Sequence, residues 1–315
     1  MSGTAMRVGV VDIGSNSTRL LIADVAPDGR IAELDRRSQV TRLGDGVDTS
    51  GRLSDAAMER VFATLGAYRT ALDGAGVAPD ARLAVLTSAV RDAANGAVFT
   101  AAVRDRYGLD ARTIAGEEEA RLTFLGATHG RPPGDTTPLL VFDIGGGSTE
   151  LVVGHAGHVD FHVSTQAGVV RQTERHVHHD PPQPRELQAL ADELREILAE
   201  QVPADVRSRA QAAIGVAGTA TSLAAIDLEL EPYDPARVHG HVAELGDAEL
   251  ALARLAQLPL AQRREVPGLH PDRAPTIVAG MVILIEVLRA FGFRRVEVSE
   301  HDLLHGVALE RAGAR

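Results

Sequence analysis

Cysteine and lysine are both absent from this chain of 315 residues, and each absence excludes a kind of chemistry. Without cysteine there are no disulfides, no zinc–thiolate sites and no thiol nucleophile. Without lysine, all 32 basic residues are arginines, and a Walker A loop, which needs a lysine, is excluded. The sequence also contains neither a G-x-G-x-x-G loop after a predicted strand nor a G-x-S-x-G nucleophile elbow.

Aromatic residues and long apolar runs are scarce as well. Aromatic residues make up 3% of the chain and apolar residues 44%, so the core must be built from alanine, valine, leucine and isoleucine. No run approaches the roughly 18 apolar residues of a membrane span, because the longest candidate, 276–288, is interrupted by Gly280 and Glu286. The first residues do not resemble a secretory signal. We therefore expect a cytoplasmic protein with no membrane partner.

The charge balance restricts the possible partners further. The formal net charge of −11 argues against a surface that binds nucleic acid. It does not exclude a small anionic substrate, because a cleft can be locally positive on an acidic protein. The length suits two domains of ordinary size.

Two segments of the chain resemble each other closely. Each is predicted to form a strand, a tight turn and a second strand, with the turn sequences DIGSNS at 12–17 and DIGGGS at 143–148. Aligned over 12–23 and 143–154, the copies share Asp, Ile, Gly, Ser, Thr and Leu, six of twelve positions. We interpret this as a duplication with one copy in each domain.

These loops are suited to binding phosphate. Glycine lets the backbone approach a ligand and point successive N–H groups at one anion, and serine, threonine and asparagine add donors. The aspartates at the strand ends, Asp12 and Asp143, can bind Mg²⁺ or Mn²⁺. Ordinary hairpin turns are the alternative, but two copies with the same strand-end aspartate disfavour it. The predicted phosphate-binding residues are Gly14, Ser15, Asn16 and Ser17 in the first loop and Gly145, Gly146, Gly147 and Ser148 in the second.

One difference between the copies is informative. The first has Arg19 where the second has Glu150. A strand residue two places beyond Ser148 lies on the same side of the strand, so Glu150 can face the loop. A carboxylate facing a phosphate is unfavourable unless a cation, or a water to be activated, lies between them. An exposed strand glutamate is the alternative.

The rest of the chain alternates between predicted helices and strands, which indicates mixed α/β sheets covered by helices. Ser54 is a plausible N-cap for the first long helix. The predicted helices are 55–72, 97–106, 117–128, 185–201, 274–290 and 303–311, and the predicted strands outside the hairpins are 83–87, 214–216 and 296–299.

The segments DIGSNSTRLLIADV and VFDIGGGSTELVVG are similar to the two phosphate motifs of the actin, Hsp70 and sugar-kinase superfamily. More narrowly, they resemble the exopolyphosphatase/guanosine-pentaphosphate phosphatase family. Similar segments occur along nearly the whole chain, among them TSAVRDAAN at 87–95, AGEEEARLTFLGA at 115–127, GVAGTATSLAA at 215–225 and RAPTIVAGMVIL at 273–284. The resemblance implies two actin-like (ribonuclease H-like) α/β domains with an interdomain cleft. We expect domain I to cover 1–116, with the helix 302–315 packing back on it, and domain II to cover 117–301.

The resemblance also implies roles for particular residues. It places Asp143 and Glu150 at a metal site, and it makes Glu119, the glutamate before an Ala-Arg pair, the general base. The residues alone do not choose among Glu117, Glu118 and Glu119, because acidic side chains in a first helical turn also complement the helix dipole.

Two further segments resemble phosphate-contacting parts of the family. Arg91 follows a predicted strand end, and its guanidinium can bind phosphate through two donors; a surface ion pair with Asp92 or Asp105 is the alternative. Gly218 and Thr219 resemble the third loop of the superfamily. The histidines at 176, 178, 179, 301 and 305 are expected to have surface or packing roles.

The function that this resemblance implies is exopolyphosphatase: Mg²⁺-assisted attack by a water, activated by Glu119, on the terminal phosphoanhydride of inorganic polyphosphate. Long family members carry an extra C-terminal helical region, so this shorter chain favours short polyphosphate over a nucleotide. Hydrolysis of guanosine pentaphosphate, a (p)ppGpp-type substrate of the stringent response, is the close alternative. A non-catalytic polyphosphate- or alarmone-binding protein is a third possibility, and a homodimer is common in the family. A superfamily sugar kinase is disfavoured, because its usual cysteine-rich zinc motif is impossible here.

Overall fold

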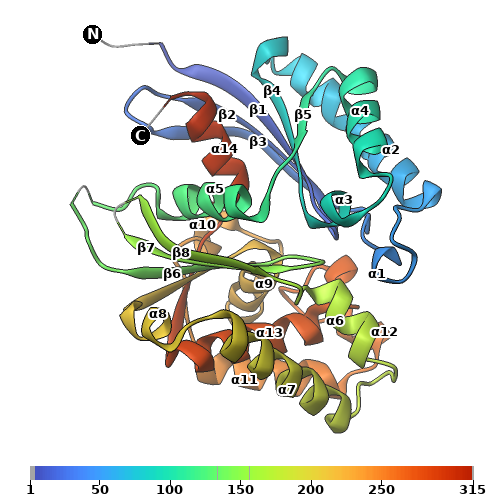
Figure 1. Ribbon diagram of the computed structural model, residues 1–315, viewed down its shortest axis with the longest axis vertical. Helices are drawn as coiled ribbons and strands as arrows, with labels where there is room; N and C mark the ends of the chain where they lie inside the picture. Colours follow the sequence, from blue (N-terminus) through green and yellow to red (C-terminus); the bar gives the residue numbers. More distant parts are fainter. Residues whose placement is uncertain (1–3, 133, 156, 314–315) are drawn as a thin grey trace. The chain divides into compact units, whose positions relative to one another are not determined.

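The computed structural model describes residues 4–132, 134–155 and 157–313, and it divides into two compact units (Figure 1). The first unit contains the described residues up to Gly130 together with those from Leu303 onward. The second unit runs from Arg131 to Asp302. The first unit is therefore discontinuous in the sequence.

The first unit is built on a five-stranded mixed sheet in the order β3-β2-β1-β4-β5. Its first three strands are antiparallel, whereas β4 is parallel to both β1 and β5. Its elements are β1 (Met6–Ile13), β2 (Ser17–Val25), β3 (Ile31–Val40), α1 (Val47–Ser50), α2 (Asp55–Gly74), η1 (Pro79–Ala81), β4 (Arg82–Leu86), α3 (Ser88–Asp92), α4 (Gly96–Tyr107), β5 (Asp110–Thr113), α5 (Gly116–Thr128) and α14 (Leu303–Arg311).

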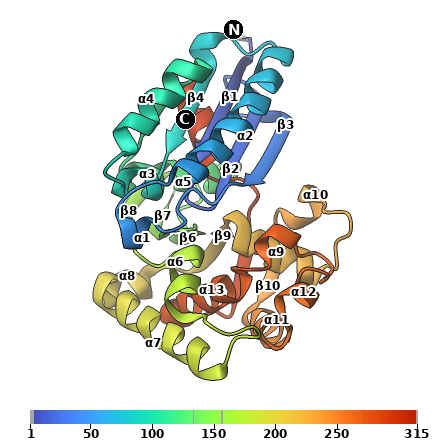
Figure 2. The ribbon, with the colours of Figure 1, turned by 90° about the vertical axis from the view of Figure 1, so that its right-hand side faces the viewer.

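Both faces of this sheet are covered by helices (Figures 1 and 2). On one face, α2 and α4 bury Val11 and Ile13 of β1. On the other face, Val8 and Val10 of the same strand pack with residues of α5 and α14. The alternation of side chains along β1 thus supplies two separate cores, and the strand is buried on both faces.

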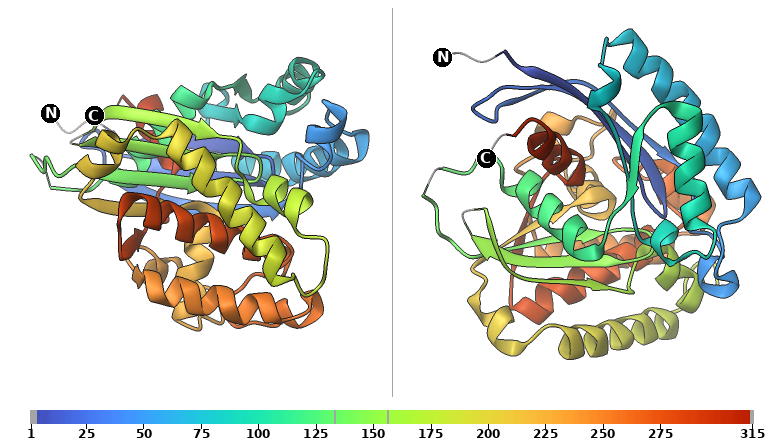
Figure 3. Two further views of the ribbon diagram at one scale, coloured as in Figure 1. Left: turned by 60° about the horizontal axis from the view of Figure 1, so that its bottom comes forward. Right: turned by 45° about the horizontal axis from the view of Figure 1, so that its top comes forward.

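Helices α5 and α14 cross at very short range, and Figure 3 shows them side by side. A Cβ placed on Gly306 of α14 would lie 1.9 Å from the carbonyl oxygen of Leu122 in α5. Only glycine fits at this crossing. Because of this packing, α5 falls within the first unit, whereas the sequence-based boundary at residue 116 assigns that helix to the second domain.

The second unit repeats the same topology. Its sheet has the order β10-β11-β9-β6-β7-β8, in which β6, β7 and β8 are antiparallel like β1, β2 and β3, and β9 and β11 are parallel to β6 and to each other. The shared strand order is what a duplication predicts. Its elements are β6 (Leu139–Ile144), β7 (Thr149–His155), β8 (His158–Thr165), α6 (Val169–His176), α7 (Pro184–Gln201), α8 (Ala204–Arg209), β9 (Ala212–Val216), α9 (Ala217–Asp227), α10 (Pro235–Val238), β10 (Val242–Glu244), α11 (Leu245–Gln257), α12 (Leu260–Arg263), η2 (Pro271–Arg273), α13 (Ile277–Phe291) and β11 (Arg295–Val298).

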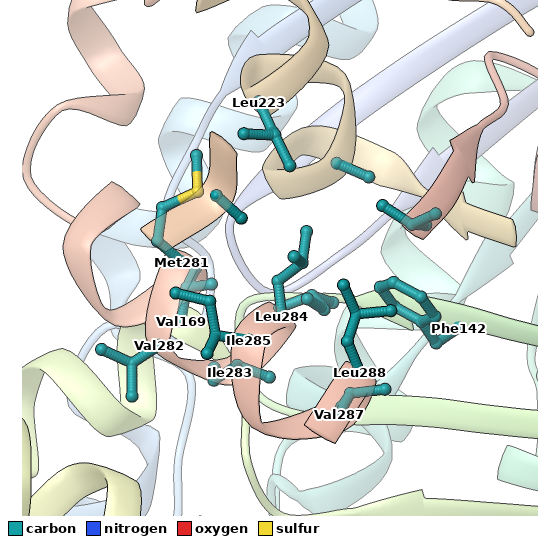
Figure 4. Close-up of a cluster of buried hydrophobic side chains, with 14 of the residues drawn as sticks. Phe142, Val169, Leu223, Met281, Val282, Ile283, Leu284, Ile285, Val287 and Leu288 are labelled. Atoms are coloured by element: carbon teal, nitrogen blue, oxygen red, sulfur yellow. The ribbon is translucent and has the colours of Figure 1, made fainter. Parts of the chain in front are cut away.

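The core of the second unit is centred on α13, which is buried along nearly its whole length. Figure 4 shows Met281, Leu284 and Leu288 of this helix beside Phe142 of β6 and Leu223 of α9. Helices α7 and α11 flank α13 on the same face of the sheet (Figure 3). Among the described residues, no helix is long and apolar enough to cross a membrane.

Candidate functional site

The first loop, between β1 and β2, is closed by its own backbone and held by a second segment of the first unit. The amide of Gly14 donates to the carbonyl oxygen of Ser17 at 3.0 Å. The carbonyl oxygen of Asn16 accepts from the amides of Thr41 and Arg42 at 3.0 and 2.8 Å. Because these carbonyl oxygens are engaged inside the protein, the peptides have the orientation that an anion-binding loop needs.

Ser15 is buried and ties this loop to the first turn of α3. Its hydroxyl lies 2.9 Å from that of Ser88 and accepts from the amide of Ala89 at 3.2 Å, while its carbonyl oxygen accepts from the amide of Gly44 at 2.8 Å. The side chain of Ser15 therefore supports the shape of the loop.

The second loop, between β6 and β7, closes in the same way but has a different support. The amide of Gly145 donates to the carbonyl oxygen of Ser148 at 3.0 Å. The carbonyl oxygens of Gly145 and Gly146 accept from the first amides of α6, those of Val169 and Val170, both at 2.9 Å. A helix N-terminus thus holds the carbonyl side of the loop, which satisfies amides that have no partner within the helix.

Gly147 completes this arrangement. Its carbonyl oxygen accepts from the amide of Gly168 at 3.2 Å and from Nε of Arg171 at 2.8 Å. A Cβ on Gly168 would lie 2.3 Å from the carbonyl oxygen of Gly146, so only glycine allows α6 to approach the loop this closely.

The strand-end aspartates face different residues in the two hairpins. In the first, Asp12 is directly opposite Arg19. The Arg19 guanidinium donates a hydrogen bond from Nε to Asp12 Oδ2 at 2.8 Å, and its Nη2 lies 2.7 Å from the same oxygen. In the second, Asp143 is directly opposite Glu150. Both of these carboxylates are buried, with 8% and 2% of their surface exposed. The first hairpin therefore has a neutralised ion pair where the second has two adjacent carboxylates.

The acidic start of α5 contains one buried glutamate. Glu117 is exposed, and Glu118 is half-exposed and forms an ion pair with Arg112 at 3.2 Å. Glu119, in contrast, is only 7% exposed. The carboxylate of Glu119 accepts from Nη1 of Arg91 at 3.2 Å. A buried carboxylate with a charged partner is a candidate functional group, so the structure distinguishes Glu119 from its two neighbours, which the residue pattern alone does not.

Arg91 lies just beyond β4, in α3. Besides Glu119, its Nη1 donates to the carbonyl oxygen of Ile114 at 3.1 Å, and its Nε is 3.9 Å from Asp92. The predicted alternative, a surface ion pair with Asp92, is thus the weakest of these contacts. The contact with the Glu119 carboxylate, at 3.2 Å, is shorter.

A third glycine turn leads from β9 into α9 in the second unit. Ala217 has a positive φ of 60°, and Thr219 is buried in the first turn of the helix. A Cβ on Gly218 would lie 1.2 Å from Nη1 of Arg273, so this guanidinium lies directly against the turn. A helix N-terminus and an arginine together make a positive site suited to phosphate.

Comparison with known proteins agrees with this arrangement. Residues 21–314 match the model of the Ppx/GppA phosphatase family. The chain belongs to this family. It is 37% identical to Exopolyphosphatase 2 of Mycobacterium tuberculosis over 98% of its own length and 99% of that protein's. Among solved structures, the chain is similar to an exopolyphosphatase-like protein, with a TM-score of 0.90 and 33% identity over 98% of each chain. It is also similar to the Aquifex aeolicus member of the Ppx/GppA family, with a TM-score of 0.81 and 32% identity over 97% of each chain.

Membership of the Ppx/GppA family confirms three of the sequence-based predictions. These are the family itself, the fold class of two α/β units with mixed sheets flanked by helices, and the class of enzyme, a hydrolase that acts on phosphoanhydrides. The roles of individual residues stay predictions.

The carboxylates of the second hairpin fit a divalent cation. Asp143 and Glu150 supply hard oxygen donors, which Mg²⁺ and Mn²⁺ prefer, and like charges directly opposite each other on neighbouring strands repel unless a cation lies nearby. Asp12 was predicted to bind metal as well, but the ion pair with Arg19 already neutralises it. The second hairpin is thus the better candidate for a divalent cation.

Two arginines of the site were missed at the level of sequence. Arg273 begins the RAPTIVAGMVIL segment, which was taken only as evidence for the family, and Arg171 follows Gly168 by three residues. An arginine that lies in a family-like segment or close to a small-residue turn could have indicated both residues. A phosphatase without lysine must use arginine for every permanently charged side chain that binds phosphate. The histidines His176, His179 and His305 each contact a glutamate, and their surface or packing roles stay a prediction.

Proposed function

We propose that this member of the Ppx/GppA family is an exopolyphosphatase that releases orthophosphate from the end of short inorganic polyphosphate. The observation that supports this most is the pair of buried carboxylates, Asp143 and Glu150, beside a loop whose carbonyl side is held by α6. A protein that only gripped a polyanion would gain nothing from two buried negative charges there, because they repel phosphate. A hydrolase that uses a cation needs them.

In this proposal, phosphate and the cation are bound by different groups of residues. The amides of the loops at 14–17 and 145–148, with the N-terminal turn of α9 at Gly218 and Thr219, bind phosphate oxygens. Asp143 and Glu150 hold Mg²⁺ or Mn²⁺. When bound, this cation neutralises the charge on phosphate oxygens and so lowers the energy of the transition state.

Glu119 is the general base in this proposal. Its carboxylate takes a proton from the attacking water as the oxygen of that water bonds to the terminal phosphorus. The bridging P–O bond breaks, and the products are orthophosphate and a polyphosphate shorter by one unit. Arg91 keeps the carboxylate in one orientation, so the base needs little reorganisation during the reaction.

A substrate panel tests the proposal. Orthophosphate release is measured with short polyphosphate, long polyphosphate, guanosine pentaphosphate and ATP, with Mg²⁺ and with excess chelator. We expect the highest kcat/KM with short polyphosphate and no release in chelator. A preference for guanosine pentaphosphate would favour the alternative function, and turnover of none of the four would indicate a binding protein.

Two neighbouring glutamates provide a matched pair of variants for the base. Glu119→Gln should lose most of the turnover while still binding polyphosphate, because only the proton acceptor is removed. Glu117→Gln, an exposed position in the same helical turn, should behave as the wild type. Equal turnover in both variants would remove Glu119 from the mechanism.

A further inference from the structure

Ser164 of β8 faces the carboxylate of Glu150. The two residues are directly opposite each other in the antiparallel pairing of β7 and β8. The Ser164 hydroxyl donates a hydrogen bond to Glu150 Oε1 at 2.8 Å. Glu150 is only 2% exposed and Ser164 is half-buried, so the contact is partly shielded from water, and a hydrogen bond to a charged group is stronger there than in water.

The alternation of side chains separates this pair from the core of the second unit. The neighbours Leu151 and Val163 point to the other face and pack in that core. Residues directly opposite on paired strands share a face, so Ser164 lies on the same side of the sheet as both Glu150 and Asp143. The hydroxyl is thus part of the carboxylate cluster.

The next residue shows what an ordinary strand hydroxyl does here. Thr165 is buried and donates to the carbonyl oxygen of Thr149 at 3.0 Å, which supports the backbone. Ser164 instead donates to a side-chain carboxylate. The two adjacent hydroxyls therefore allow the support of the strand and the orientation of Glu150 to be separated experimentally.

A neutral donor has a distinct effect on a metal-binding carboxylate. A glutamate has several rotatable bonds, and a donor at one oxygen restricts the other oxygen to few positions. An arginine would do the same but would also cancel the negative charge, as Arg19 does for Asp12. A serine orients the carboxylate without adding a positive charge of its own.

We propose that Ser164 is a positioning residue that holds Glu150 in the orientation in which it binds the divalent cation. This inference rests on the proposed function, in which Glu150 and Asp143 bind Mg²⁺ or Mn²⁺. Partners that orient metal-binding side chains typically contribute about 10- to 100-fold to metal affinity or activity.

Direct Mn²⁺ binding, followed by electron paramagnetic resonance of the free ion, tests this role without relying on turnover. Ser164→Ala should weaken Mn²⁺ binding by about tenfold and raise the Mg²⁺ concentration needed for half-maximal orthophosphate release by a similar factor. Ser164→Thr keeps the hydroxyl and suits a strand, so it should stay within about twofold of the wild type. Thr165→Val should lower thermal stability and leave Mn²⁺ affinity unchanged.

A double-mutant cycle with Glu150→Gln identifies the residue through which Ser164 acts. In that background, Ser164→Ala should change neither the Mn²⁺ affinity nor kcat, because the carboxylate that it orients is gone. An equal loss in both backgrounds, or wild-type Mn²⁺ affinity in Ser164→Ala, would overturn the inference.

The outcomes also separate this inference from the proposed function. Suppose that the wild-type protein hydrolyses polyphosphate but that Glu150→Gln does not change its Mn²⁺ binding. This result would overturn the role of Ser164 and leave the proposed activity in place. A protein that shows the expected Mn²⁺ pattern but hydrolyses none of the four substrates overturns the proposed function alone.

Discussion

The hairpins at 12–19 and 143–150 have similar turn sequences, the same antiparallel strand pairing and the same strand-end aspartate, but a different local charge. Across the first hairpin Asp12 faces Arg19, and across the second Asp143 faces Glu150. One position in the second strand therefore changes the local charge of an otherwise similar loop by two units. In the proposed function, this difference is what makes the second hairpin the cation site.

The supports of the two loops differ as well. The first is held by the segment at 41–44 and by the hydroxyl of Ser88, and the second by the N-terminus of α6. A cation site needs a loop that keeps its position when charges change nearby, and a helix N-terminus anchored at several amides offers this rigidity.

The largest effect should come from Glu150→Gln. Removal of this carboxylate should lower kcat for orthophosphate release by roughly a thousandfold, about 4 kcal/mol of transition-state stabilisation. The free energy of unfolding without metal should stay constant or rise, because one of two adjacent like charges is removed. Turnover assays and urea denaturation in chelator measure the two quantities. A variant with nearly normal turnover would place the metal elsewhere.

The next effect concerns Arg19. Arg19→Gln should cost about 3 kcal/mol of folding stability without metal, because the nearly buried Asp12 loses its ion pair with Arg19. Arg19→Glu should cost more, because it also places a second carboxylate opposite Asp12. Arg19→Glu should then regain stability in millimolar Mg²⁺, since it recreates in the first hairpin the carboxylate pair of the second. Thermal denaturation with and without Mg²⁺ measures this. Identical Mg²⁺ responses in the two variants would show that the facing pair alone does not make a cation site.

A smaller effect is expected where each loop meets its support. Gly168→Ala places a Cβ 2.3 Å from the carbonyl oxygen of Gly146, so α6 or the loop must move, at a cost of about 2 kcal/mol. Gly44→Ala in the first unit meets the Cβ of Ser15 at 3.0 Å and should cost less. Both costs are measured by urea denaturation. If Gly44→Ala were the more damaging, the first loop would be the more rigidly held.

The smallest effect belongs to the hydroxyl pair behind the first loop. Ser88→Ala should cost about 1 kcal/mol, because Ser15 keeps the amide of Ala89 as a donor after the loss of its partner. The KM for polyphosphate should rise slightly while kcat stays constant, since Gly146, the counterpart of Ser15 in the second loop, works without a hydroxyl. A fall in kcat would contradict a purely supporting role.

Much of the fold could be predicted from the sequence because its central elements carry strong local signals. Ser54 caps α2 as predicted, with its hydroxyl accepting from the amide of Ala57, and the predicted last helix 303–311 is present. Strand β3 was not predicted because it is a polar edge strand with little apolar alternation. Helix α6 was not predicted either, because its 8 residues are too few to show a helical period of apolar positions and it follows a strand of mixed polarity.

The site was less predictable, for a physical reason. The exchange of Arg19 for Glu150 is visible in an alignment of the two hairpins, because strand register follows from the turn. The contact between Arg91 and Glu119 joins residues 28 positions apart, and it depends on how α3 and α5 pack. Arg273 reaches the turn at Gly218 through a tertiary contact of the same kind. Residues brought together by packing have no periodic signal in the sequence.

The return of α14 to the first unit has a consequence for biosynthesis. The face of β1 that carries Val8 and Val10 is covered in part by a helix that is synthesised after the whole of the second unit. The second unit is continuous in the sequence and can fold as it is translated, whereas the first unit keeps an apolar face open until α14 has been synthesised. Nascent or truncated chains that lack α14 should therefore be the form of this protein that chaperones bind and proteases remove.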